Sequence, residues 1–263
     1  MQIFDIHTHL LPGIDDGSPD WDETMRMVYQ AYEDGTTDIA ITHHILSDQD
    51  YARESEILEK FEELKTRVAD AQLGLKFHLA AELFYHHEIE LNHKISTFND
   101  NKKYFLVEFP MQGIPRYVDD KFFEFIIDKI TPILAHPERN LGIINKPERA
   151  FEFVQRGVML QMNAGSLNGD FGEDVRAMAE SLLDARLIHF VGSDGHDTKR
   201  RPIKMKRAYH QIVDRFGQNV ADSLFRENPA KAMQGLEIRI PEPMPVEPPK
   251  TKKGFGLFKK FGF

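Results

Sequence analysis

The chain has 263 residues, of which 41% are hydrophobic and 29% are charged, and its formal net charge is −9. A length of about 250 residues suits a single α/β barrel, and the acidic balance argues against nucleic-acid binding, which depends on a basic surface. Cysteine is absent, which excludes disulfides, thiolate metal ligands and a thiolate nucleophile.

Short apolar stretches typical of β-strands alternate seven times with longer segments of helical periodicity. The expected strands, in chain order, are Gln2–His7, Asp38–His43, Leu75–Glu82, Tyr104–Phe109, Thr131–His136, Val158–Asn163 and Leu187–Ser193. The expected helices are Asp22–Asp34, Arg53–Ala71, Lys121–Lys129, Pro147–Arg156, Glu173–Ala185 and Pro202–Phe216. This alternation predicts an α/β protein, a distorted (β/α)7 TIM-like barrel, over residues 1–239.

Several of these strands are apolar until their last residues and then end on His, Asp or Glu. The residues at or just beyond the strand ends are His7, His9, His43, Glu82, Glu108, His136, Asp194 and His196. The carboxyl ends of parallel barrel strands meet on one face of the molecule, where barrel enzymes carry their active sites. We therefore predict that these eight residues form one metal site.

The spacing of the ligand types supports this prediction. His7 and His9 are two apart, as are Asp194 and His196, so each pair can reach one ion from the same side of a strand. Glu108, at the end of an apolar strand, is suited to bridging two cations, although an ion pair with an arginine is an alternative for either glutamate. Nitrogen and oxygen ligands without sulfur favour manganese, zinc or iron over calcium, and the set suffices for two or three ions.

Three further residues are candidates for binding the substrate. Arg139 follows His136 by three residues, where its guanidinium could clamp phosphate oxygens. Arg201 follows His196 at a similar remove, and Asp16 lies in a turn after the first strand, where a structural role competes with a role in the site. The remaining histidines, including His44, lack the strand-end placement, and we assign them no role.

Together these residues resemble the polymerase and histidinol phosphatase (PHP) superfamily, specifically its bacterial manganese-dependent tyrosine-phosphatase branch, which regulates capsule and exopolysaccharide synthesis. The resemblance covers most of residues 1–235. It is carried by Asp5-Ile6-His7-Thr8-His9, Asp15-Asp16-Gly17, Thr42-His43, Ala81-Glu82, Val107-Glu108-Phe109, Ala135-His136-Pro137-Glu138-Arg139 and Ser193-Asp194-Gly195-His196.

The resemblance implies a trinuclear metal centre, usually manganese, that hydrolyses phosphotyrosine by metal-activated hydroxide. On that pattern the eight strand-end residues are ligands, while Asp16, Arg139 and Arg201 assist the phosphate or the leaving group. The implied substrate is a phosphotyrosine protein such as a membrane-associated bacterial tyrosine kinase. A small-molecule phosphatase such as histidinol phosphatase, and a metal-binding regulator without catalysis, are the alternatives.

Beyond residue 239 the composition changes. Five prolines between residues 241 and 249 predict an extended spacer without a core, and residues 250–263 are basic and aromatic. This composition suits contact with an anionic membrane surface or an acidic partner, and a segment folded back on the barrel is the alternative. Because no signal peptide or apolar run of about 18 residues is recognisable, we expect a cytoplasmic protein, peripheral to the membrane at most.

Overall fold

The computed structural model describes residues 2–247, which are built around seven parallel strands. The strands neighbour one another in chain order. They are β1 (Ile3–Thr8), β2 (Thr36–Ile45), β3 (Lys76–Phe84), β4 (Tyr104–Glu108), β5 (Thr131–Ala135), β6 (Met159–Asn163) and β7 (Phe190–Gly192). A parallel bridge between Thr8 and Gly195 brings the chain after β7 back to β1 and nearly closes the sheet. The predicted seven-stranded barrel is confirmed.

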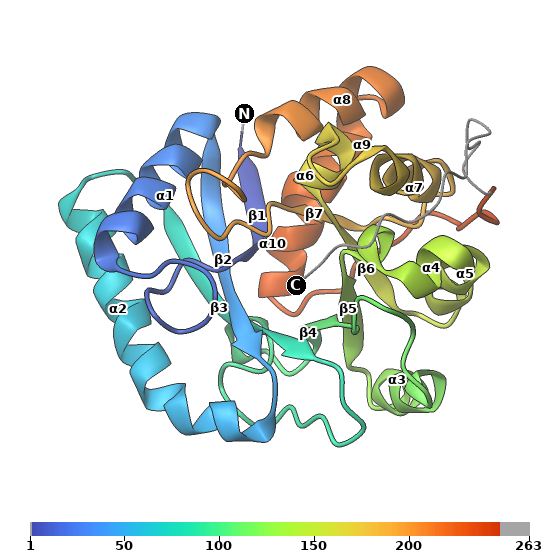
Figure 1. The fold of residues 1–263 in the computed structure, drawn as a ribbon, viewed down its shortest axis with the longest axis horizontal. Helices are drawn as coiled ribbons and strands as arrows, with labels where there is room; N and C mark the ends of the chain where they lie inside the picture. The colour runs from blue at the N-terminus through green and yellow to red at the C-terminus, as the bar shows by residue number, and fades with distance from the viewer. Residues whose placement is uncertain (1, 248–263) are drawn as a thin grey trace, which may run out of the picture.

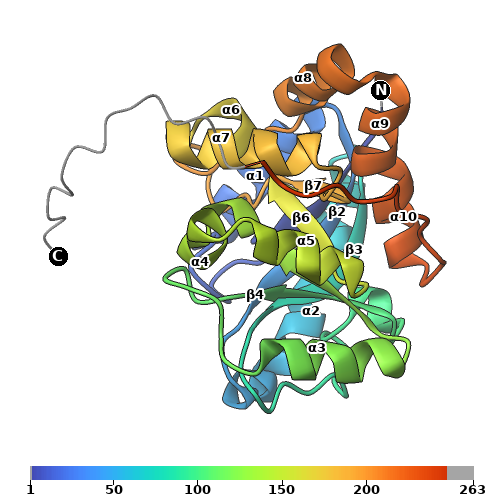
Figure 2. The same ribbon diagram turned by 90° about the vertical axis from the view of Figure 1, so that its right-hand side faces the viewer.

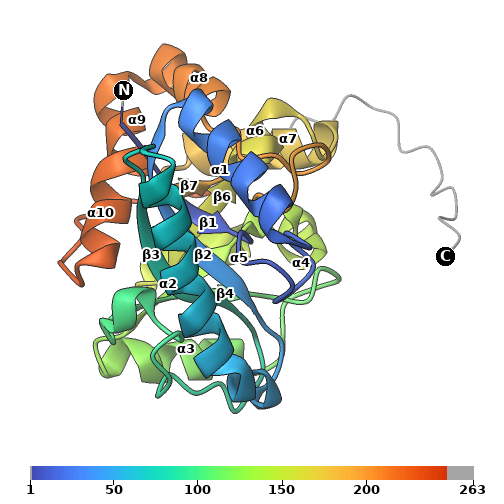
Figure 3. The same ribbon diagram turned by 90° about the vertical axis from the view of Figure 1, so that its left-hand side faces the viewer.

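Helices surround the barrel on its outside (Figure 1). In Figure 3, α1 (Trp21–Asp34) and α2 (Glu54–Asp70) lie over the first three strands. The opposite flank, in Figure 2, carries α3 (Val118–Ile127), α4 (Leu141–Asn145), α5 (Glu148–Gln155), α6 (Ala164–Asn168) and α7 (Glu173–Asp184). After β7 come α8 (Lys206–Phe216), α9 (Gln218–Asp222), a π-helical turn at Ser223–Glu227 and α10 (Asn228–Met233).

The six expected helices are present, although the last begins at Lys206 instead of Pro202. The sequence did not predict α4, α6, α9 or α10, because each is only five or six residues long. Such segments are too short to display a helical period.

Two apolar cores divide the strand side chains between them, because successive side chains of a strand point to opposite faces. The inner core fills the barrel. Its strand residues are Phe4, Ile6, Ala40, Ala80, Tyr104, Leu106, Ile133, Ala135, Met159 and Phe190. Phe98, Ala232 and Met233 join this core from outside the strands, and they cover the amino-terminal end of the barrel. The outer core, with Ile39 and Ile41 among its members, lies between the strands and the helices.

Residues 240–247 continue from the barrel without helix or strand. Ile240 and Val246 pack against the outer core, and Met244 N donates a hydrogen bond to Ala185 O at 2.9 Å. The prediction of a spacer without a core is therefore wrong for this part, because apolar side chains stand between its prolines. The rest of the predicted tail, residues 248–263, lies outside the described residues. Among residues 2–247, no helix combines the length and the apolar character needed to cross a membrane.

Candidate metal centre

Side chains at the carboxyl ends of the strands converge into four overlapping groups of possible metal ligands. In each group, one nitrogen or oxygen atom per residue lies within 4.8 Å of the others. The groups are His7, Glu82 and His136; His7, His9 and Asp194; His44, Glu82 and Glu108; and His9, Asp16, His44 and His196. Seven of the eight predicted ligands belong to at least one group, and Asp16 belongs to one as well.

The inner part of this cluster crowds imidazole nitrogens and carboxylate oxygens around one point. His7 Nε2 lies 3.2 Å from His9 Nε2, 3.1 Å from Glu82 Oε2 and 3.5 Å from Asp194 Oδ1. Within residues 2–247, neither Glu82 Oε2 nor Asp194 Oδ1 has a hydrogen-bond partner, and both side chains are buried. Buried carboxylates that are short of donors are costly. A divalent cation between these lone pairs fits the donor set.

Glu82 is the carboxylate that two of the four groups share. Its Oε1 is 3.0 Å from His136 Nε2, while its Oε2 is 3.2 Å from His44 Nδ1 and also faces His7. Glu108 belongs to only one group, with its Oε1 3.6 Å from His44 Nδ1. Of the two glutamates, Glu82 therefore has the placement that would suit bridging two cations, the role that the sequence suggested for Glu108.

His44, not His43, enters the cluster from β2. Ala40 and His44 are four residues apart, so both face the barrel interior, whereas His43 is in phase with the outer-core residues Ile39 and Ile41. The His43 ring is fully buried, burial lowers its pKa to about 4, and within the described chain neither ring nitrogen has a hydrogen-bond partner. His43 belongs to none of the four groups. The structure thus does not support the ligand role predicted for His43.

The outer group lies at the mouth of the barrel. Asp16 Oδ1 is 3.4 Å from both His44 Nε2 and His196 Nε2, and the Asp16 side chain is 65% exposed. This position makes Asp16 a candidate ligand, whereas the sequence predicted an aid to the substrate. The turn can come so close because residue 17 is glycine, where a Cβ atom would lie 2.2 Å from His9 O.

Asp15, which sequence reasoning passed over, orients His9. Its Oδ2 lies 2.7 Å from His9 Nδ1 and accepts a hydrogen bond from His44 N at 3.0 Å. A histidine that binds metal through one nitrogen commonly donates its other N–H to a carboxylate. The adjacent acidic pair was the only sequence signal, and it did not reveal which aspartate faces which group.

Two predicted ligands adopt unusual backbone angles. His136 has φ 32° and Asp194 has φ 56°, in the left-handed region that side chains with a Cβ rarely enter. Each follows shortly after the end of a strand, and Asp194 N donates a hydrogen bond to His7 O at 2.8 Å. Such conformations cost about 1–3 kcal/mol each and concentrate at functional sites. Here they occur where both side chains join the cluster.

Arg139 and Arg201, the predicted phosphate-binding residues, lie at the edge of the cluster, and both contact Asp194. Arg139 Nη1 donates to Asp194 Oδ2 at 2.9 Å, and Arg201 Nη2 pairs with the same oxygen. The Arg139 guanidinium also lies over the Phe171 ring, 4.4 Å from its centroid. Neither arginine is buried, with side chains 19% and 27% exposed, so both can reach a ligand at the mouth.

Negative charge is crowded in this site. Burial and the nearby Glu82 carboxylate raise the pKa of Glu108 to about 7. Crowding of like charges raises a carboxyl pKa in this way, and a bound cation relieves it. The raised pKa of Glu108 and the convergence of the ligand groups thus both indicate a cation site.

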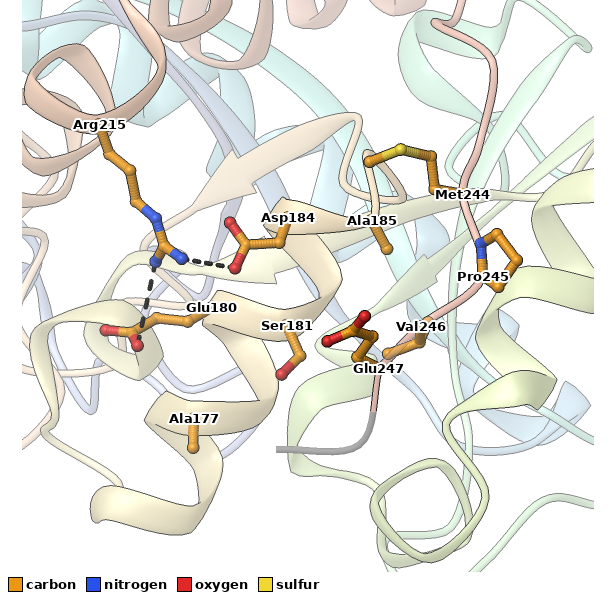
Figure 4. Close-up of a pocket in the computed structure, with 10 residues that line it drawn as sticks. All are labelled: Ala177, Glu180, Ser181, Asp184, Ala185, Arg215, Met244, Pro245, Val246 and Glu247. Atoms are coloured by element: carbon orange, nitrogen blue, oxygen red, sulfur yellow. Dashed lines mark hydrogen bonds and ion pairs between the residues drawn. The ribbon is translucent and has the colours of Figure 1, made fainter. Parts of the chain in front are cut away.

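The cluster is distinct from a surface pocket of about 820 Å³ between α7 and residues 244–247 (Figure 4). No member of the four groups lines that pocket. Its Arg215 is already engaged by Asp184 at 2.5 Å, so its polar groups do not call for a ligand.

Comparison with known proteins places the chain in a family. Residues 3–234 match the family described as "Capsular polysaccharide synthesis, CpsB/CapC". The tyrosine-protein phosphatase YwqE of Bacillus subtilis is 33% identical over 97% of this chain and 100% of its own length. CpsB of Streptococcus pneumoniae, also named a tyrosine-protein phosphatase, is 30% identical over 87% of this chain and 97% of its own.

A solved structure agrees with these sequence relatives. It comes from crystal structures of YwqE and CpsB, described as unique metal-dependent tyrosine phosphatases, and it superposes with a TM-score of 0.86 at 31% identity. The superposition covers 94% of this chain and all of the other. The resemblance inferred from the sequence motifs is confirmed, and the chain belongs to the CpsB/CapC family of capsular polysaccharide synthesis.

Proposed function

We propose that this protein is a metal-dependent protein-tyrosine phosphatase. The observation that carries the proposal is the set of four overlapping ligand groups with two arginines at their edge. The chain has no cysteine, so a thiolate phosphatase mechanism is impossible. Family membership and the named activity of the relatives support the same conclusion.

Manganese is the ion we propose, with zinc and iron as alternatives. Imidazole and carboxylate ligands without sulfur suit all three, and the four groups share enough members for two or three neighbouring ions. Cations bound there would activate water and neutralise charge on the phosphate ester. His7, His9, Glu82, His136 and Asp194 would hold the inner ions. Glu108, Asp16, His44 and His196 would complete the set.

The chain's own residues then bind and orient the substrate. Arg139 and Arg201 exchange Asp194 for phosphoryl oxygens, which charge-assisted hydrogen bonds hold in a fixed direction. The Phe171 ring supports the Arg139 guanidinium during that exchange. Because a phenol has a pKa of about 10, the departing tyrosine needs little help from a general acid. This favours phosphotyrosine over esters of aliphatic alcohols.

The proposal is tested with one set of assays. Protein stripped by a chelator and refilled with manganese, zinc or iron is assayed on phosphotyrosine and phosphoserine peptides and on histidinol phosphate. We expect phosphotyrosine hydrolysis to disappear on chelation, to return best with manganese, and to withstand iodoacetamide. Activity that survives rigorous metal removal would refute the mechanism. Faster hydrolysis of histidinol phosphate would refute the substrate assignment.

We further propose that the substrate is a membrane-associated bacterial tyrosine kinase, met at the cytoplasmic face of the membrane. The basic and aromatic composition of residues 250–263 supports this proposal, since lysines contribute about 1 kcal/mol each near an anionic surface. Truncation after Glu247 keeps the residues that pack on the barrel. It should preserve hydrolysis of a small phosphotyrosine mimic and reduce binding to anionic liposomes. Equal liposome binding by both forms would remove the membrane contact.

A further inference from the structure

Strand β6 contributes no member to the four ligand groups, yet two of its side chains contact the candidate ligands. Gln161 and Asn163 are fully buried and in phase with Met159, which belongs to the inner core. They therefore point into the barrel just below the cluster. Buried amides of this kind need their donors and acceptors satisfied, and their partners indicate what the amides do.

Gln161 contacts His7 in an orientation that its other contacts fix. Its Nε2 donates to Met162 O at 2.8 Å and to Asn163 Oδ1 at 3.0 Å. A backbone carbonyl only accepts, so Nε2 is the donor end of the amide. Its Oε1, 2.9 Å from His7 Nδ1, must accept, and His7 Nδ1 must carry the proton. When His7 is neutral, as a metal ligand must be, its lone pair then lies on Nε2, the atom that faces Glu82 and Asp194.

Asn163 acts on the other side of the same ion site. Its Nδ2 donates to Asp194 Oδ2 at 2.7 Å, and its own backbone N–H is anchored on Glu138 Oε1 at 3.0 Å. Asp194 Oδ2 is thus engaged even when the arginines turn to a phosphate. Asp194 Oδ1, without a hydrogen-bond partner among residues 2–247, is left facing His7 and His9.

We propose that Gln161 and Asn163 are positioning residues that prepare His7 and Asp194 for metal binding. Gln161 selects the tautomer of His7 with a free Nε2 lone pair, and Asn163 selects which Asp194 oxygen faces the ion. The hydrogen bond between the two amides joins both functions into one unit. This inference rests on the proposed metal-dependent function but assigns roles to residues that neither touch the substrate nor bind the ion.

The test replaces Gln161 with methionine, which has a similar shape but accepts hydrogen bonds only weakly, and with glutamate, which accepts them strongly. Gln161→Met should weaken zinc and manganese affinity by about 10–100-fold, the usual effect of losing a partner behind a metal ligand. Gln161→Glu keeps an acceptor for His7 Nδ1, so the proton should stay on that nitrogen, while its second oxygen can no longer donate to Met162 O and Asn163 Oδ1. Asn163→Leu should weaken affinity by a similar factor to Gln161→Met. Met162→Leu, on the outward side of the same strand, is the control for packing.

A second readout does not depend on activity. In metal-free wild-type protein, at a pH high enough for His7 to be neutral, the ¹⁵N resonances of His7 should show the proton on Nδ1, and Gln161→Met should populate the Nε2-protonated form. Metal affinity within twofold of wild type for Gln161→Met and Asn163→Leu, with an unchanged His7 tautomer, would overturn the proposal. If Gln161→Met does not fold, the His7 tautomer in wild type and in Gln161→Glu decides it. A wild-type protein that binds no metal would instead refute the proposed function.

Discussion

The two ends of the barrel both pair histidine with carboxylates, but their polar atoms differ in what they contact. At the amino-terminal end, His78 Nε2 lies 3.3 Å from Asp38 Oδ1, and His78 Nδ1 accepts from Asn99 Nδ2 at 3.1 Å. Both nitrogens have partners within the protein, as a structural contact requires. At the carboxyl-terminal end, Glu82 Oε2 and Asp194 Oδ1 converge with imidazoles and lack donors within the described chain. Buried carboxylate oxygens without hydrogen-bond donors, more than the presence of histidine, distinguish the candidate metal site.

The largest effect should come from removing one anionic ligand at the carboxyl-terminal end of the barrel. Glu82→Gln takes a charge from the carboxylate that two ligand groups share, so metal content should fall and phosphotyrosine turnover should drop by about a hundredfold. Asp38→Asn makes the same change at the amino-terminal end of the barrel. It should leave metal content and phosphotyrosine turnover within about twofold of wild type. Metal analysis and steady-state kinetics on the two variants check this. Comparable losses in both variants, or none in Glu82→Gln, would break the comparison.

Adjacent histidines on β2 allow a sharper test. His44→Gln removes a member of two ligand groups, so it should lower metal content and reduce turnover by roughly 10–100-fold. His43→Gln puts an amide without a hydrogen-bond partner into a buried place on the outer side of the strand, so the free energy of unfolding should fall by about 1–3 kcal/mol with metal content retained. Metal analysis beside chemical denaturation separates the two. Loss of metal in His43→Gln alone would reinstate the sequence prediction.

Arg139 should influence substrate binding more than metal binding. Arg139→Ala removes one of the two cations on Asp194 Oδ2, so metal should stay bound while kcat/KM for phosphotyrosine falls roughly a hundredfold. Arg149→Ala is the matched control, because Arg149 also lies over a phenylalanine, 4.8 Å from the Phe153 centroid, and pairs with Asp119 away from the cluster. Metal loss and unfolding in Arg139→Ala would mean that this arginine is structural.

The smallest effect concerns a histidine that precedes β7, outside the ligand groups. His189 is buried, its Nδ1 accepts from Leu160 N at 3.0 Å, and burial lowers its pKa to about 3. The fold therefore favours neutral His189. The resulting stability is present above pH 6.5 and is lost as the pH falls toward 3. In metal-free protein, His189→Gln should lower the free energy of unfolding at pH 7 by about 1 kcal/mol.

The pH dependence of that variant is the decisive comparison. Between pH 6.5 and 3 its free energy of unfolding should fall less steeply than that of wild type, because one titrating group is gone. Denaturation curves at several pH values measure the difference. Identical slopes would show that His189 does not contribute to acid unfolding.

The sequence predicts the barrel and most of the cluster because apolar periodicity locates the strands and their ends carry the ligands. It led us to choose His43 instead of His44, because a shift of one residue reverses which face a side chain takes. The clue to His44 was Ala40, because residues four apart in a strand point to the same face. Gln161 and Asn163 escaped notice because amides are not typical ligands and their roles depend on contacts between distant strands. The role of Asp15 could not be predicted, because it depends on how closely the turn at Gly17 approaches His9 in the folded chain.

Anomalous diffraction from crystals of manganese-loaded protein tests the central claim most directly. We predict strong anomalous peaks between His7, His9 and Asp194 and between Glu82 and His136, with Glu82 shared and His44 coordinating an ion. The same crystals should show no ion bound by His78 and Asp38. Peaks at His43, or an absence of peaks among the strand-end residues in crystals of active protein, would contradict the account.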